Sequence, residues 1–402
     1  MHTKLIVGLA VALTGASVAV VAQNPPQFKA GVELVSVDVQ VVDKDGKPIA
    51  GIKPEDFEVT IDGRKRTVVS AQLIQYQSAA QVAAAPAAPA GDAAPPATGT
   101  PQRRTYVIGV DEFSIRLGSA RAAMEAAKRF LAQLGPDDLV GLVAYPQAGV
   151  RVDPTNDHAK IIAGLDKVKA LFEPPPTKYN VSAAEAIDIA SNNGGTAGQV
   201  VERECAGLTG YAYIACSTAV KMDGQSLGLA LEATLTQSLG GLRGLLNDMG
   251  TLPGRKILVL VSGGLVMSDK GVGRGDETGR MFDIGRIAAL TNTSLYALHM
   301  DTRFLDAYAE RKVSHTIFRD EQIFSAGLDK VAAAAGGTVF RVRTGSGDPA
   351  FSRVLLETSA QYLLGVDVAA EDRGKKAAQI IQVKVKTKGA TVRHRMSVVI
   401  PK

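Results

Sequence analysis

Few side chains in this sequence are placed to do acid–base or nucleophilic chemistry. The turn after the apolar run at 257–261 reads VSGGL, which lacks the Ser between two glycines of a nucleophile elbow. His299 stands at the end of a predicted strand close to Asp301, so the two could pair, but a packed, hydrogen-bonded histidine is the commoner arrangement. The remaining histidines stand in no recognisable nucleophile motif: His2, His158, His315 and His394. We therefore expect no enzyme, with a hydrolase of unrecognised site as the alternative.

A glycine-rich stretch at 271–279, GVGRGDETG, could cradle a phosphate. It lacks the Lys-Ser/Thr pair of a P-loop and does not lie directly between a strand and a helix at the required spacing. Its tripeptide Arg274-Gly275-Asp276 resembles an adhesion motif that also arises by chance, so we interpret the stretch as a flexible loop. The formal charge of +5 is spread along the chain without a long basic run, which argues against nucleic acid as the main partner.

The first residues have the features of an export signal. A short basic start, an apolar run and a small-residue end at Val20-Val21-Ala22 predict a cleaved signal peptide at 1–22, with a membrane anchor as the alternative. We expect a secreted or periplasmic protein with no stable membrane span after cleavage. The two cysteines of the chain, Cys205 and Cys216, are then expected to pair as a disulfide, because exported proteins meet an oxidising environment.

The chain divides into segments of different character. Residues 28–77 alternate apolar and polar side chains and predict a small β module. Residues 78–102 are an Ala/Pro-rich linker. Residues 103–345 alternate strands with helices, interrupted by an insertion at 173–222, and predict a doubly wound, mostly parallel α/β sheet. Residues 346–402 return to β, and we expect them to pack with the N-terminal module as a β-sandwich-like unit, because each part alone has too few strands.

Several stretches in a fixed order carry a resemblance to a known family. They are VELVSVDVQVVDKDGKPIAGIKPEDFEVTIDG, TYVIGVDEFS, GRKILVLVSGGL, LYALHMDTR, VAAAAGGTVFRV and SAQYLLGVDV. In this order the chain resembles bacterial exported proteins related to the von Willebrand factor A (vWA) domain. The resemblance covers nearly all of the mature chain except the linker and the insertion. It implies a Rossmann-like sheet whose ligands bind where the strands end.

The same resemblance implies a metal site that this sequence has largely lost. The family pattern is Asp-x-Ser-x-Ser after the first strand, a Thr from a second loop and an Asp after the fourth strand. Asp111 and Thr155 fit, although Thr155 could equally cap a helix, and Ser114 is one position out of register. Other residues replace the remaining ligands: Phe113, Ile115 and Gly263. We expect no cofactor; a retained Mg²⁺ or Ca²⁺ would instead favour a metal-dependent vWA adhesion module.

Without a metal, binding must rely on aromatic and arginine side chains. In this type of sheet the loops at the carboxyl ends of the strands gather on one face. Phe113 and Tyr145 stand near positions where a metal site would need polar residues, and Arg116 and Arg303 add hydrogen-bond donors. Phe113 and Tyr145 could instead merely fill the gap left by the lost site. The sequence therefore predicts a non-enzymatic protein that binds a protein or peptide partner on this face.

Overall fold

Strands and helices alternate along the middle of the chain and build one mostly parallel sheet of six strands. The structure is a computed structural model that describes residues 34–76, 103–147, 149–267, 277–301, 315–342, 347–369, 372–374 and 378–400. The strand order is β10 (Val339–Val342), β9 (Thr293–Met300), β8 (Lys256–Ser262), β5 (Thr105–Asp111), β6 (Leu139–Tyr145) and β7 (Arg151–Thr155). Neighbouring strands are parallel except for β7, which pairs antiparallel at the edge. The predicted α/β class with a mostly parallel sheet is therefore confirmed.

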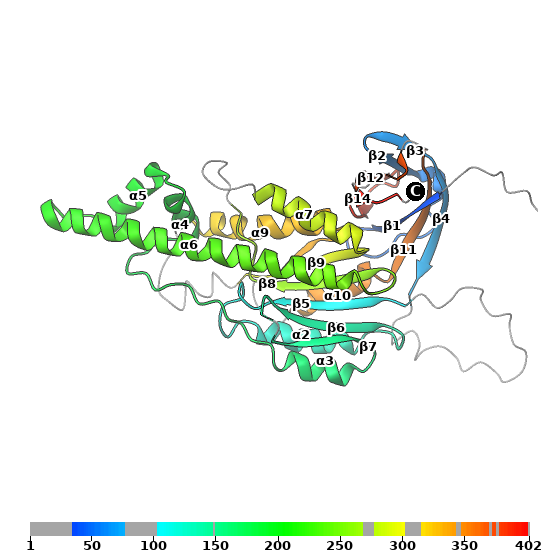
Figure 1. The fold of residues 1–402 in the computed structure, drawn as a ribbon, viewed down its shortest axis with the longest axis horizontal. Coiled ribbons are helices and arrows are strands. Elements are labelled where there is room, and N and C mark those ends of the chain that lie inside the picture. The colour runs from blue at the N-terminus through cyan, green and yellow to red at the C-terminus, as the bar shows by residue number, and fades with distance from the viewer. Residues whose placement is uncertain are drawn as a thin grey trace, which may run out of the picture. The chain divides into compact units, whose positions relative to one another are not determined.

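Helices cover both faces of this sheet (Figure 1). One face packs on α2 (Arg121–Leu131), α3 (His158–Leu165) and α10 (Asp348–Glu357). The other packs on α6 (Gly210–Met249), α7 (Glu277–Leu290) and α9 (Ile317–Ala334). Side chains alternate along β5, so Tyr106 and Ile108 enter the first core and Val107 enters the second. Both faces are buried, which explains why β8 is an unbroken apolar run in the sequence.

Strands from both ends of the chain form two antiparallel sheets. The first has the order β13 (Thr391–Arg393), β1 (Leu34–Val42), β11 (Ala360–Asp367), β4 (Val68–Gln75). The second has the order β14 (Ser397–Val398), β12 (Gln379–Val385), β2 (Phe57–Ile61), β3 (Arg64–Arg66), and a short 3₁₀ turn, η1 (Pro54–Asp56), precedes β2. Their inner faces share one core, to which β1 contributes four alternating valines: Val35, Val37, Val39 and Val41.

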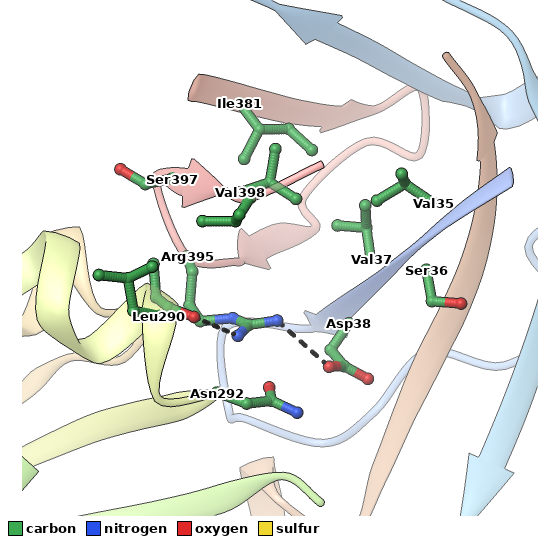
Figure 2. Close-up of a pocket in the computed structure, with 12 residues that line it drawn as sticks. Val35, Ser36, Val37, Asp38, Leu290, Asn292, Ile381, Arg395, Ser397 and Val398 are labelled. Carbon is green, nitrogen blue, oxygen red and sulfur yellow. Dashed lines mark hydrogen bonds and ion pairs between the residues drawn. The ribbon is translucent and has the colours of Figure 1, made fainter. Parts of the chain in front are cut away.

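Hydrogen bonds join these sheets to the α/β part. Tyr296 on β9 donates from its hydroxyl to Gln40 on β1 at 2.7 Å, and both residues are buried. Arg395 donates to the carbonyl oxygen of Ala289 at 3.1 Å and pairs with Asp38 at 3.4 Å (Figure 2). These two contacts lie at a small cavity of about 240 Å³ that Leu290 and Asn292 also line.

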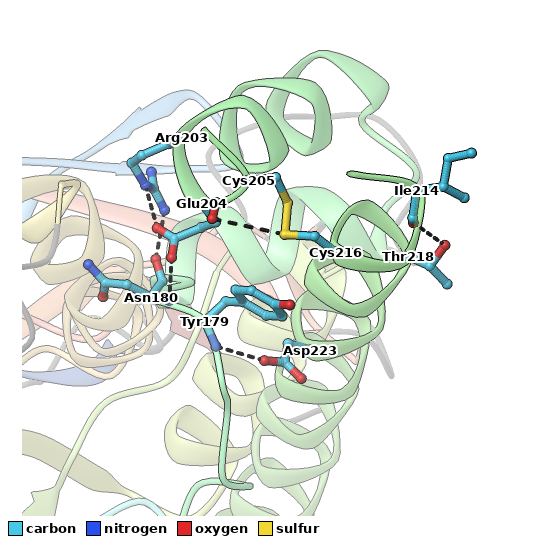
Figure 3. The surroundings of a disulfide bond; sticks show 9 residues. All are labelled: Tyr179, Asn180, Arg203, Glu204, Cys205, Ile214, Cys216, Thr218 and Asp223. Atoms are coloured by element: carbon cyan, nitrogen blue, oxygen red, sulfur yellow. Dashed lines mark hydrogen bonds and ion pairs between the residues drawn. A yellow bond between two sulfur atoms is a disulfide. The ribbon is translucent and has the colours of Figure 1, made fainter. Parts of the chain in front are cut away.

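The insertion is helical and continuous with the sheet-covering helix. It contains α4 (Ala183–Ala190) and α5 (Gly194–Glu204), and α6 begins within it at Gly210. The expected end of the insertion at residue 222 therefore falls inside this 40-residue helix. Cys205 and Cys216 form a disulfide that ties the end of α5 to the second turn of α6 (Figure 3). None of the helices in the described part of the chain combines the length and apolarity needed to cross a membrane.

Candidate functional site

A buried network of one carboxylate and three hydroxyls lies where β5 and β8 end. Asp111, the last residue of β5, accepts a hydrogen bond of 2.9 Å from Ser238 on α6 and one of 3.2 Å from Ser262, the last residue of β8. The hydroxyls of Ser262 and Ser114 are hydrogen-bonded at 3.0 Å. Asp111, Ser238 and Ser262 have no exposed surface, and Ser114 is 9% exposed, so only Ser114 of the network reaches solvent.

Burial controls the ionisation of this network. Removal from water raises the pKa of Asp111 to about 6, and the hydrogen bonds from Ser238, Ser114 and Ser262 only partly offset that effect. Burial also raises the pKa of Tyr145 well above its usual value, and the charge of nearby Asp111 adds to this rise. The hydroxyl of Tyr145 makes no hydrogen bond to any described residue. The end of β5 thus holds a buried polar cluster within an apolar setting.

The structure separates Thr155 from this network. Thr155 pairs with Val140 at the start of β6, whereas Asp111 pairs with Tyr145 at its end. Five residues of strand correspond to roughly 16 Å, so Thr155 and Asp111 lie near opposite ends of the sheet's strands. The hydroxyl of Thr155 accepts a hydrogen bond of 3.0 Å from the Asp157 backbone where α3 begins. Ser238, which the sequence analysis did not single out, is the residue that reaches Asp111 instead.

This donor set does not fit a hard divalent cation. Mg²⁺ requires near-octahedral oxygen ligands and usually retains several waters, and Ca²⁺ takes still more oxygens. Here one carboxylate supplies the charge, its oxygens already accept hydrogen bonds from Ser238 and Ser262, and Asp111 is fully buried. Within the described ranges, no group of three or more His, Cys, Asp or Glu side chains is arranged to hold a metal ion.

The two glycines after Ser262 allow the neighbouring loop to come close. A Cβ on Gly263 would lie 1.9 Å from the backbone oxygen of Ser114, so only glycine fits beside that loop. Gly264 has a φ of +129°, and a Cβ there would meet the backbone oxygen of Phe324 at 2.8 Å. The Ser-Gly-Gly ending thus places one hydroxyl in the network and lets two backbone segments pack against it.

The predicted partner-binding residues have different surroundings. Phe113 and Arg116 share the loop after β5 and are both half-buried. Tyr145 is only 4% exposed and packs in the core beneath α6, so its ring is a filler rather than a surface anchor in this structure. Arg303 and the tripeptide at 274–276 lie outside the described residues. Buried His299 approaches the carbonyl oxygen of Gly263 at 3.2 Å and is a packed core residue.

A surface groove lies beside the loop that carries Phe113 and Arg116. It has a volume of about 410 Å³ and runs between the start of α2 and the segment that follows α3. Backbone hydrogen bonds from Leu171 to Glu112 and from Leu117 to Phe172 attach that segment to the end of β5. Sequence reasoning missed this groove because two segments about 50 residues apart in the chain form it, and neither has a motif.

Apolar side chains and arginine or lysine heads line the groove. Leu117 is 64% exposed and Leu171 is 39% exposed, which is unusual for large aliphatic side chains. Arg121 and Lys169 are exposed on its walls and form no ion pair with another described residue. Lys128 bonds both acidic side chains of the groove, Glu125 at 2.9 Å and Asp166 at 2.6 Å, and its single charge offsets one of the two carboxylates. A bound group would therefore meet an apolar surface whose walls, with Lys128 included, carry three cations and two carboxylates.

The insertion packs on the segment after β8 and on α9. Val266, just after β8, and Ile323 of α9 belong to the core that α4, α5 and the first half of α6 share. Arg319 forms two hydrogen bonds with Asp188 of α4, at 2.8 and 2.9 Å, and Asp320 accepts one of 2.8 Å from the backbone of Ala184. The groove beside α2 lies outside this covered region.

A comparison with protein-family models finds no match, and a comparison with curated proteins finds no significant match.

Proposed function

We propose that this protein is an exported, non-enzymatic binding protein of the vWA-related type, which holds a protein or peptide partner at the carboxyl edge of its parallel sheet. The observation that carries the proposal is the groove between α2 and the segment after α3, where exposed Leu117 and Leu171 stand beside Arg121 and Lys169. Such a surface suits a partner segment with an apolar side chain next to carboxylates.

The polar network next to the groove supports a metal-independent mode of binding. Its carboxylate is enclosed and already hydrogen-bonded, so it stabilises the loop from Glu112 to Ala120 rather than contacting a ligand. The loop, held in place by these hydrogen bonds, then carries Phe113, Arg116 and Leu117 toward the partner. Contact energy in this arrangement comes from desolvating the two leucines, and the cations contribute orientation and association rate.

Partner capture from the cell envelope of the source organism tests the proposal. Leu117→Asp and Arg121→Glu should each reduce recovery of the captured partner at least tenfold, because the first places a charge in the apolar groove and the second reverses its edge. Matched controls on α6 are Leu229→Asp and Lys221→Glu, which change equally exposed residues outside the groove. If the control variants lose the partner and the groove variants retain it, the binding site is on α6 and the proposal fails.

The same capture experiment also separates metal-independent binding from binding by a metal-dependent adhesion module. Capture in the presence of Mg²⁺ and capture in the presence of a chelator should recover equal amounts of partner. The melting temperature of the protein should likewise be unchanged at millimolar Mg²⁺. A saturable rise of several degrees, or partner binding only with Mg²⁺, would favour the metal-dependent alternative.

A further inference from the structure

Among the residues that the structure describes, strand β4 forms an open edge of the first antiparallel sheet. It is the last strand in the order β13-β1-β11-β4 and pairs with β11 on one side only. Figure 1 shows β4 beyond β11, at the end of that sheet. Such an edge presents a row of backbone donors and acceptors that can pair with another strand.

The register identifies which backbone groups point outward. Tyr76 donates its backbone N–H to Ser359, so it belongs to a hydrogen-bonded pair, and every second residue before it faces β11 in the same way. The alternate residues Ala71, Leu73 and Gln75 therefore direct their N–H and C=O groups away from β11. None of the described residues hydrogen-bonds to these outward groups.

The composition of β4 differs from that of two other edge strands, β3 and β7. Its eight residues, VVSAQLIQ, include no charge and no proline. By contrast, β3 consists of Arg64-Lys65-Arg66, and β7 carries Arg151, Asp153 and Pro154. Charges and proline are the usual means by which proteins prevent edge-to-edge pairing. The edge of β4 lacks this protection, although the same chain applies it elsewhere.

We propose that β4 pairs antiparallel with β4 of a second copy of this chain, across a two-fold axis. The two four-stranded sheets would join into one sheet of eight strands. An uncharged strand is self-complementary in this arrangement, whereas a strand such as β3 would place like charges opposite each other. A foreign strand would need side-chain pockets for specificity, and neither the 240 Å³ cavity beside Arg395 nor the groove beside α2 borders β4.

Sedimentation equilibrium of the purified chain from residue 23 onward tests this pairing. The mass should rise from one to two chains with concentration. Ala71→Pro should leave a monomer, because it removes one outward N–H while sparing the β11 ladder. Gln72→Lys should do the same by placing two cations near each other across the new pair, without changing the backbone. Gln382→Lys, an equally exposed change on interior strand β12, should still dimerise.

Unfolding must be separated from loss of pairing. Gln72→Lys should keep the circular dichroism spectrum and melting temperature of the monomeric parent at low concentration. Amide hydrogen exchange gives an independent readout, because the amides of Ala71 and Leu73 should become protected only at concentrations where the dimer forms. A parent that stays monomeric at every concentration overturns the proposal, as does a dimer that persists in both Ala71→Pro and Gln72→Lys. Neither outcome bears on the groove beside α2.

Discussion

Ser238, in the second half of α6, donates a hydrogen bond of 2.9 Å to Asp111, the last residue of β5. This bond joins a helix that continues from the insertion to the strand end where α/β sheets commonly bind ligands. It uses one carboxylate oxygen, and Ser262 uses the other. The carboxylate therefore acts inside the protein and fixes α6, β5 and β8 relative to one another.

The pH dependence of stability should report on Asp111. Its pKa is raised from 3.8 to about 6 in the folded protein, mainly by burial, so the folded state binds more protons than the unfolded state between these values. The stability linked to this group is present in full below pH 3.8 and is lost as the pH rises through about 6. Asp111→Asn removes the titration. The parent should therefore lose about 3 kcal/mol relative to the variant between pH 3.5 and pH 7.

Urea unfolding of parent and Asp111→Asn at these two pH values measures the effect. Comparing the difference between the two proteins cancels the titration of all other groups. A difference that stays the same at both pH values would show that Asp111 keeps an ordinary pKa in the folded state.

Gly263 should tolerate no side chain. A Cβ there would lie 1.9 Å from the Ser114 backbone oxygen, and backbone cannot move aside as a flexible side chain can. Gly263→Ala should cost about 1–3 kcal/mol of unfolding free energy. The matched control is Gly240→Ala in α6, where a Cβ meets nothing within 4 Å. The control should stabilise the protein by roughly 0.5–1 kcal/mol through helix propensity. If both changes shift the urea midpoint in the same direction, the Ser114 backbone does not lie close enough to Gly263 to exclude a side chain.

Local patterns predicted much of the fold. The alternating valines of β1 and the apolar run of β8 indicated one strand with a single buried face and one strand buried on both faces. Other elements carried no such signal. The first half of α6, from Gly210, mixes glycine, tyrosine and alanine without an evident apolar face, and it is helical because α4 and α5 pack against it. Helix α10 also went unpredicted, since it is short and lies between two strand patterns.

The candidate site was predictable only in part. Asp111 and Ser114 follow a strand, so their place at the carboxyl end of the sheet could be inferred. Ser238 is 127 positions from Asp111 in the chain. A helical period can indicate which face of α6 is buried, but it cannot show which strand end that face meets. The resemblance suggested Thr155, yet β7 runs antiparallel to β6, so that residue lies at the other end of the strands from Asp111.

The disulfide should stabilise the insertion rather than the sheet. Cys205 and Cys216 close a short loop with a separation of 11 residues, for which the chain-entropy model gives about 3 kcal/mol. The double variant Cys205→Ser/Cys216→Ser should lose hydrogen-exchange protection in α5 and the first turns of α6, and keep it in β5 and β8. Reductant should bring the parent to the same pattern and leave the double variant unchanged. Equal loss of protection in the sheet would contradict this local role.

The contact between Asp188 and Arg319 should hold the insertion on α9. Arg319 donates two hydrogen bonds to Asp188, whose side chain is only 2% exposed. Asp188→Ala leaves the guanidinium without its buried partner, so it should cost about 3 kcal/mol and expose α4 to hydrogen exchange. Asp248→Ala makes the same chemical change in a pair with Arg151, where the two side chains are 53% and 50% exposed, and should cost less than about 1 kcal/mol. Urea unfolding combined with exchange measures both variants. Equal costs, or an α4 that stays protected in Asp188→Ala, would mean that the insertion is held by its apolar core alone.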